Sequence, residues 1–132
     1  ELIDYDTFCG AVSEEAADAA ADATISVVQL EHMLKEREEG TRDFVLVDVR
    51  EPNEYEINRI PGSVLIPKGD FLNGSALEKL PSDKQIVMHC KTGVRSAETL
   101  AIVKGAGYSD AVHVGGGVVA WVNQIDPSQP SY

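Results

Sequence analysis

The sequence predicts an α/β fold in which a mostly parallel sheet is covered by helices on both faces. Short runs rich in Val, Ile and Leu alternate along the chain with segments of helical periodicity, a pattern typical of parallel sheets. The chain has 132 residues, of which 43% are hydrophobic and 25% charged, the balance of an ordinary globular domain. A domain of this length can bury enough apolar surface to fold without disulfide bonds or structural metals.

The folded domain is expected to span residues 24–132, and residues 1–23 are interpreted as a linker or tail. Residues 13–23 are rich in alanine and acidic residues and contain no large apolar side chain. This composition fits a short solvated helix capped by Ser13 and a flexible linker about equally well.

The first helix of the domain is predicted to begin after Ser26 and to end at Gly40. Ser26 and Gln29 have the spacing of a capping box, in which each side chain accepts a hydrogen bond from the other residue's backbone. Leu30 and Met33 then recur at helical spacing, and glycine is the usual residue just past a helix end.

Three further segments have helical patterns, at residues 51–57, 96–106 and 118–125. Pro52 suits the first position of its helix, because proline lacks the N–H that a first turn leaves unpaired. Residues 71–80 are ambiguous and fit a short helix closed by Pro81.

Four short apolar segments predict strands, at residues 44–49, within 60–67, at 85–90 and at 111–114. Ligands of such sheets bind beyond the carboxyl ends of the strands. Cys90 is the last residue of one predicted strand, and Asp48 and Arg50 lie at the end of another. We therefore expect the two strand ends to face the same crevice.

The charge of the chain argues against a nucleic-acid partner and against an anionic membrane surface. Eleven basic and 22 acidic residues give 11 − 22 = −11, whereas phosphate binding requires clustered Lys and Arg. No apolar run approaches the ~18 residues of a membrane span, and residues 1–5 lack the basic start of a signal peptide. A cytoplasmic protein is expected, and the missing initial Met suggests a piece of a longer chain.

The cysteines and histidines predict no disulfide framework and no metal site. The two cysteines, Cys9 and Cys90, lie far apart in different sequence contexts, unlike the dense cysteine patterns of small secreted domains. The three histidines are His32, His89 and His113, and neither they nor Cys9 show the spacing of metal ligands.

Cys90 is the candidate nucleophile, because it precedes a short loop and a predicted helix. The loop residues between Cys90 and Arg95 are Lys91, Thr92, Gly93 and Val94. A strand–loop–helix turn directs backbone N–H groups at one point and favours negative charge on a sulfur atom there. Lys91 and Arg95 also favour negative charge on the sulfur, and Gly93 lets the loop turn tightly. The competing interpretation is a buried structural thiol, since free cysteine is among the most buried residue types.

The length of this loop separates two kinds of chemistry. Tyrosine-phosphatase loops hold one more residue between the cysteine and the arginine that clamps phosphate. A smaller ring should disfavour a tetrahedral phosphate and suit a single additional sulfur atom. The spacing therefore favours sulfur transfer over phosphate hydrolysis.

Residues 90–96, Cys-Lys-Thr-Gly-Val-Arg-Ser, resemble the active-site loop of single-domain rhodaneses, which are sulfurtransferases. Residues 46–67 and 107–121 are similar to the upstream and closing motifs of that family, so the resemblance covers roughly residues 24–121. The resemblance implies a rhodanese-like fold, a five-stranded parallel sheet with helices on both faces.

The resemblance implies that the Cys90 thiolate accepts a sulfur atom as a persulfide and passes it to an acceptor. Both steps are thiolate displacements, so no dedicated general base is expected. No cofactor beyond the persulfide itself is expected. The loop would stabilise the persulfide anion through its N–H groups, with Lys91, Thr92, Gly93, Val94 and Arg95 as the contributing residues. Arg95 fits two roles equally, attraction of an anionic substrate and an ion pair with a carboxylate such as Glu98.

The two ends of the chain, residues 2–10 and 126–132, resemble the C-terminal part of the two-domain adenylyltransferase/sulfurtransferases of the MoeZ and MoeB type. This resemblance implies an adenylyltransferase domain before residue 1, fused or missing. It also implies a ubiquitin-like sulfur-carrier protein as acceptor, with thiosulfate or a cysteine desulfurase as donor. Molybdopterin, thiamine and cysteine biosynthesis and tRNA thiolation all remain open as pathways.

Asp48 and Arg50 fit two roles, lining of the pocket and structural support. In the structural role, Asp48 would accept hydrogen bonds from the N–H groups of its loop. Arg50 would form an ion pair with Glu51 or Glu54. The glycines at residues 115–117 are predicted to shape the turn before the last helix, beside the cysteine loop. Two alternative functions stay open, a catalytically silent binding module and a rhodanese-like phosphatase or arsenate reductase.

Overall fold

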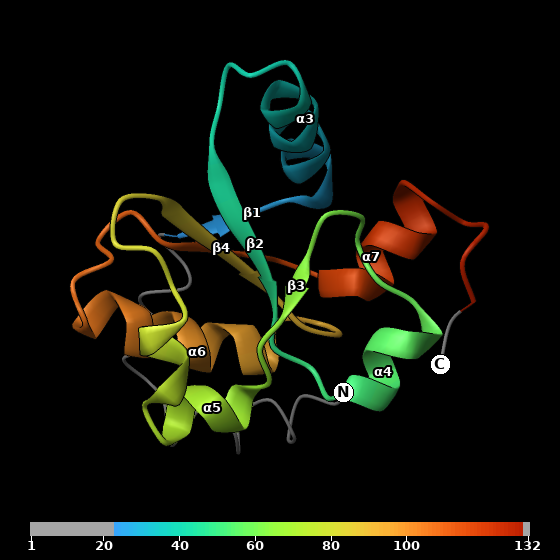
Figure 1. The fold of residues 1–132 in the computed structure, drawn as a ribbon. Helices are drawn as coiled ribbons and strands as arrows, with labels where there is room; N and C mark the ends of the chain where they lie inside the picture. The colour runs from blue at the N-terminus through green and yellow to red at the C-terminus, as the bar shows by residue number, and fades with distance from the viewer. Residues whose placement is uncertain (1–22, 131–132) are drawn as a thin grey trace.

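The computed structural model describes residues 23–130, which fold around a five-stranded parallel sheet (Figure 1). The strand order is β1-β5-β4-β2-β3. The strands are β1 (Thr24–Ile25), β2 (Phe44–Asp48), β3 (Val64–Leu65), β4 (Gln85–His89) and β5 (Val112–Val114). The predicted α/β fold is confirmed, whereas the linker or tail proposed for residues 1–23 falls almost wholly outside the described residues.

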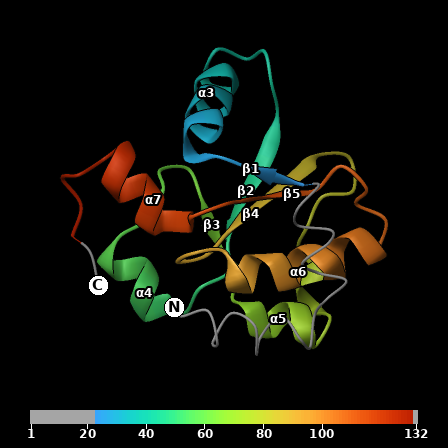
Figure 2. The same ribbon diagram turned by 180° about the vertical axis from the view of Figure 1, so that it is seen from behind.

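Helices cover both faces of the sheet, as predicted (Figures 1 and 2). The helices are α3 (Val27–Glu38), α4 (Pro52–Ile57), α5 (Lys68–Leu72), α6 (Val94–Gly105) and α7 (Gly117–Gln124), with a 3-10 helix η1 (Ser75–Glu78). The first and last of these, α3 and α7, pack on one face, and α5, η1 and α6 pack on the other. None of the helices in residues 23–130 is both long and apolar enough to span a bilayer.

The alternation of side chains along the central strands divides the core into two apolar clusters. Leu46 and Val87 face α3 and α7, whereas Val47 and Met88 face α5 and α6. Cys90 lies in the apolar cluster that contains Val47 and Met88, on the α6 side of the sheet. A strand pair buried on both faces explains why β2 and β4 read as continuous apolar runs.

The predicted helix ends are confirmed where the capping residues are near neighbours in the chain. Ser26 Oγ accepts from the Gln29 N–H at 3.1 Å, and Gln29 Oε1 accepts from the Ser26 N–H at 2.8 Å. Gly40 adopts a φ of 82° just beyond α3, and Pro52 occupies the first turn of α4. These caps depend on neighbours in sequence, and sequence patterns therefore detect them.

Besides shifts of one residue at several element ends, the structure differs from the predicted elements in three places. Residues 24–25 form β1 through pairing with β5, which a two-residue segment cannot reveal without its partner. Residues 71–80 divide between α5 and η1, because Gly74 takes a φ of 88° between them. The helix predicted to begin at Ser96 begins at Val94, directly after Gly93 with its φ of 125°.

The segment after α7 returns to the end of α4 (Figure 1). Asn58 Nδ2 donates to the Pro130 carbonyl at 2.7 Å, and the Arg59 N–H donates to Gln129 Oε1 at 2.9 Å. These bonds hold α4 near the carboxyl edge of the sheet, where the candidate site lies.

Candidate active site

The site lies at the carboxyl ends of β2 and β4, which are neighbours in the sheet. Asp48 pairs in register with His89, so Arg50 and Cys90 both follow strand ends at the same edge. Cys90 is the first residue after β4 rather than its last residue. The structure therefore brings together the two strand ends that the sequence indicated.

The sulfur of Cys90 receives two backbone hydrogen bonds from the turn that leads into α6. The Gly93 N–H donates to Sγ at 3.0 Å and the Ser96 N–H donates at 3.4 Å. The hydroxyl oxygen of Ser96 also lies 3.6 Å from Sγ. N–H groups held in this way stabilise negative charge on a sulfur atom without any rearrangement during reaction.

Burial and hydrogen bonding of Cys90 support different interpretations. Only 1% of the residue's surface is exposed, as for a structural thiol in the apolar cluster beneath α6. A structural thiol in such a cluster, however, requires no backbone donors, and here two N–H groups point at the sulfur. We give greater weight to the donors, because they are the feature that apolar packing does not explain.

The glycine turn before α7 holds the cysteine loop in place. The Val118 N–H donates to the Cys90 carbonyl at 2.9 Å, and the Val119 N–H donates to the Lys91 carbonyl at 3.1 Å. A Cβ at Gly117 would collide with the Cys90 carbonyl oxygen and lie 2.5 Å from that of Lys91. The predicted position of residues 115–117 beside the loop is confirmed, and α7 supports the loop through its first N–H groups.

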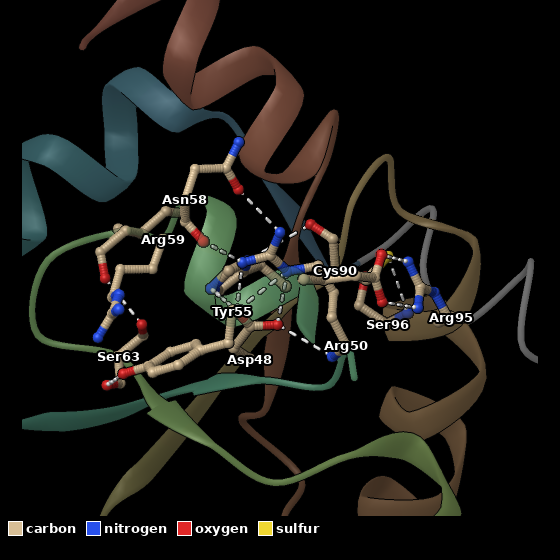
Figure 3. A network of polar contacts seen from close by, with 12 residues as sticks. Asp48, Arg50, Tyr55, Asn58, Arg59, Ser63, Cys90, Arg95 and Ser96 are labelled. Atoms are coloured by element: carbon tan, nitrogen blue, oxygen red, sulfur yellow. Dashed lines mark hydrogen bonds and ion pairs between the residues drawn. The ribbon is translucent and has the colours of Figure 1, made fainter. Parts of the chain in front are cut away.

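Asp48 and Arg50 form a fully buried ion pair that extends to Asn58 (Figure 3). Arg50 Nη2 donates to Asp48 Oδ2 at 2.7 Å, Arg50 Nη1 donates to Asn58 Oδ1 at 2.9 Å, and both charged side chains have 0% exposure. The Arg50 backbone N–H also donates to Asp48 at 2.9 Å, as expected for a loop support. The predicted partners of Arg50, Glu51 or Glu54, are replaced by Asp48, and these contacts fit structural support.

Arg95, at the start of α6, binds Glu54 of α4 with both terminal nitrogens of its guanidinium group. The two distances are 2.7 Å and 3.0 Å, the bidentate geometry that fixes an arginine most firmly. The predicted partner Glu98 instead binds Lys68 at 2.6 Å. Helical spacing favoured Glu98, but α4 brings Glu54 to the start of α6, and only the tertiary fold determines that approach.

The sequence did not indicate Ser96, which contacts the sulfur, or His113, which contacts Ser96, as residues of the site. Ser96 Oγ lies 2.8 Å from His113 Nδ1, and His113 Nε2 lies 3.2 Å from Thr24 Oγ1. Strand alternation places His113 on the same face as Met88, its partner in register. A polar residue in an otherwise apolar strand was the available signal, but the register that brings it to the cysteine loop is not readable from sequence.

His89 is the second buried histidine at this edge and lies on the face of the sheet opposite Cys90. Its Nδ1 donates to the Cys90 carbonyl at 3.4 Å, and its Nε2 lies 3.8 Å from Asp48 Oδ2. Burial lowers the pKa of His89, and Arg50 acts in the same direction, against the opposing effects of Asp48 and the Cys90 carbonyl. Burial also lowers the pKa of His113.

The domain is therefore expected to lose stability as the pH falls below about 6.5, the ordinary pKa of histidine. Below that pH the unfolded chain binds protons at His89 and His113 that the folded domain does not bind. The free energy of unfolding should fall by up to about 1.4 kcal/mol per pH unit for each histidine. Urea unfolding between pH 5.5 and 7.5 measures this slope.

A His89→Gln/His113→Gln variant should show a smaller slope over the same pH range. His32→Gln provides the control, because His32 is exposed on α3. If the double variant kept the full slope, other groups would be responsible for the pH dependence.

Comparison with known proteins identifies the domain family of the chain. Residues 27–124 match the model of the rhodanese-like domain family. The chain is 49% identical over its full length to a probable adenylyltransferase/sulfurtransferase MoeZ of Mycobacterium tuberculosis. It is 32% identical over 98% of its length to the adenylyltransferase and sulfurtransferase uba4 of Ogataea parapolymorpha. The chain spans about a third of the length of these two relatives, 33% and 31%.

A solved structure supports the same assignment. A rhodanese-like domain protein from Staphylococcus aureus superimposes with a TM-score of 0.65 at 30% identity, covering 75% of this chain and 90% of that protein. The chain belongs to the rhodanese-like domain family, and over its full length it is similar to a region of the MoeZ-type adenylyltransferase/sulfurtransferases.

Proposed function

We propose that this domain is a sulfurtransferase in which Cys90 carries the transferred sulfur as a persulfide. The observation that supports this most directly is the pair of N–H groups that donate to Sγ from Gly93 and Ser96. The names of the relatives, which describe sulfurtransferases, support the same reaction class. We propose no cofactor besides the persulfide.

The reaction consists of two displacements at sulfur. The Cys90 thiolate attacks the outer sulfur of a donor such as thiosulfate, and sulfite leaves with the electrons of the broken S–S bond. A nucleophilic acceptor such as cyanide then attacks the terminal sulfur, the S–S bond of the persulfide breaks, and Cys90 returns to the thiolate. The turn that leads into α6 holds the charge on the sulfur in both steps through the N–H groups of Gly93 and Ser96.

We further propose that the natural acceptor is the adenylated C-terminus of a ubiquitin-like sulfur carrier in the cytoplasm. The terminal sulfur of the persulfide attacks the activated carbonyl carbon and AMP leaves. Two equivalents of a thiol reductant then cleave the S–S bond, which releases the thiocarboxylate of the carrier, the Cys90 thiol and a disulfide of the reductant. This proposal relies on the full-length similarity to relatives whose names combine adenylyltransferase and sulfurtransferase activities. Those names combine an adenylyltransferase and a sulfurtransferase in one chain. The donor is thiosulfate or the persulfide of a cysteine desulfurase.

One observation favours a second function, that of a catalytically silent binding module. Cys90 has only 1% of its surface exposed, so a donor must displace neighbouring groups to reach the sulfur. A silent module would retain the fold and the buried thiol but transfer no sulfur. The two functions differ in whether Cys90 exchanges sulfur at all.

Transfer of sulfur from thiosulfate to cyanide, measured as thiocyanate, tests the proposal. Cys90→Ser is expected to lower kcat/KM by at least about 100-fold, because a serine hydroxyl cannot carry sulfane sulfur. Cys9→Ser is the matched control and should retain the activity of the natural chain. Equal activity in the Cys90→Ser variant would refute the assignment, and hydrolysis of a phosphotyrosine analogue in its place would favour a phosphatase.

A further inference from the structure

We propose that His113 accepts the thiol proton of Cys90 through the hydroxyl group of Ser96. This inference depends on the proposed function, in which Cys90 reacts as a thiolate. Ser96 contacts the reacting sulfur directly, whereas His113 acts through Ser96 as a positioning residue and proton acceptor.

The three side chains form a continuous line of short contacts from the sulfur into the core. Cys90 Sγ lies 3.6 Å from Ser96 Oγ, and Ser96 Oγ lies 2.8 Å from His113 Nδ1. His113 Nε2 continues the line to Thr24 Oγ1 at 3.2 Å. Ser96 has no exposed surface and His113 has 5%, so bulk water does not compete for these groups.

The proton transfer is balanced, because Cys90 and Ser96 each give up one proton and His113 gains one. The S–H bond of Cys90 breaks and its proton goes to Ser96 Oγ, while the hydroxyl proton of Ser96 moves to His113 Nδ1. The products are a thiolate on Cys90, a neutral Ser96 and an imidazolium on His113. This direction requires the tautomer with hydrogen on Nε2, whose N–H then donates to Thr24 Oγ1.

The surroundings of His113 suit a neutral proton acceptor. Among the described residues, the neighbouring elements present uncharged groups to the ring, namely Thr24 from β1, Met88 from β4, Ser96 from α6 and the Gly93 turn. Burial lowers the pKa of His113, so the ring is neutral at pH 7 and its Nδ1 lone pair is available. The same burial disfavours the imidazolium, and the thiolate that forms on Cys90 in the same step supplies the negative charge that stabilises it. The thiol of Cys90 is the titratable group that this line of contacts reaches.

Two competing arrangements are less favourable. Ser96 Oγ can also donate to the Gly93 carbonyl, but that distance is 3.3 Å against 2.8 Å to His113. His89 faces the other side of the sheet and contacts the backbone carbonyl of Cys90 rather than its sulfur. The geometry therefore selects His113 as the acceptor.

The rate of Cys90 alkylation by iodoacetamide, measured from pH 5 to 10, tests the relay. A Cys9→Ser background leaves Cys90 as the only thiol in the full chain. His113→Gln should move the midpoint of the rate profile to higher pH and lower the rate at pH 7 about tenfold. The plateau at high pH should stay unchanged, because there the thiol loses its proton to solvent.

Ser96→Ala should move the midpoint as far as His113→Gln does, and the double variant should move it no further. Such non-additivity is the mark of residues that act in series. His89→Gln is the matched control for loss of a buried histidine and should leave the midpoint unchanged. Circular dichroism and thermal unfolding confirm that each variant is folded at each pH used.

An unchanged midpoint in His113→Gln, or an equal loss of rate at every pH, would overturn the relay. The second result would mean a purely structural role for His113. Failure of the relay differs from failure of the proposed function. If Cys90 accepts sulfur from thiosulfate while the His113→Gln midpoint stays unchanged, the relay alone is wrong.

Discussion

Replacement of Arg50 by methionine is expected to lower the free energy of unfolding by about 3–5 kcal/mol. Arg50 and Asp48 are both fully buried and held by paired hydrogen bonds at 2.7 to 3.0 Å. Methionine fills part of the volume but leaves the Asp48 carboxylate buried without its counter-charge, and Asn58 also loses its donor. Urea unfolding monitored by tryptophan fluorescence measures the change.

Arg42→Met is the matched control, because Arg42 binds Glu36 on the surface at 2.8 Å with both side chains well exposed. Exposed pairs of this kind contribute at most about 1 kcal/mol. A second variant, Asp48→Leu with Arg50→Met, should regain part of the lost stability, since no charge is then left buried. If Arg50→Met lowered the free energy of unfolding no more than Arg42→Met, the buried pair would contribute no more to stability than an exposed pair.

Substitution of Gly117 by alanine is expected to separate α7 from the cysteine loop and to abolish sulfur loading. Gly117 has a φ of 56°, a conformation that costs a residue with a Cβ about 1–2 kcal/mol. The added methyl group also collides with the carbonyl oxygens of Cys90 and Lys91, and overpacking of this kind costs about 1–3 kcal/mol more. Since those atoms are backbone, no side chain can rotate away to relieve the contact.

Gly74→Ala distinguishes the collision from the effect of backbone conformation. Gly74 has a φ of 88°, but a Cβ there would have no atom within 4 Å. It should lose only about 1–2 kcal/mol and retain sulfur loading. Equal losses of stability and activity in the two variants would mean that the contact between α7 and the cysteine loop has no special importance.

The parts of the fold that the sequence could predict are those determined by local patterns. Apolar runs identified β2 and β4 because both faces of these strands are buried, and the Ser26–Gln29 box identified the start of α3. The strand β1 was missed because two residues carry no period, and its pairing with β5 depends on the sheet order. The early start of α6 at Val94 follows from the φ of Gly93, a property that a glycine permits but does not require.

The candidate site also combines features that the local sequence predicts with features that only the tertiary fold determines. The positions of Cys90, Gly93 and the glycine turn before α7 could be predicted, because they depend on a short strand–loop–helix segment. The partners of Arg50 and Arg95 could not, because many carboxylates lie within reach in sequence and only packing selects one. His113 lies 23 residues from Cys90 by number, 113 − 90, and reaches it only through the register of β5 beside β4.

The most direct test of Cys90 as the sulfur carrier is the intact mass of the chain after incubation with thiosulfate. A gain of about 32 Da, one sulfur atom, is expected for the natural chain and for Cys9→Ser, and reduction with dithiothreitol should reverse it. Cys90→Ser should show no gain. A gain of the same size in Cys90→Ser would contradict the assignment of Cys90. Absence of any gain in the natural chain, with thiosulfate and then with a cysteine-desulfurase donor, would contradict persulfide transfer itself.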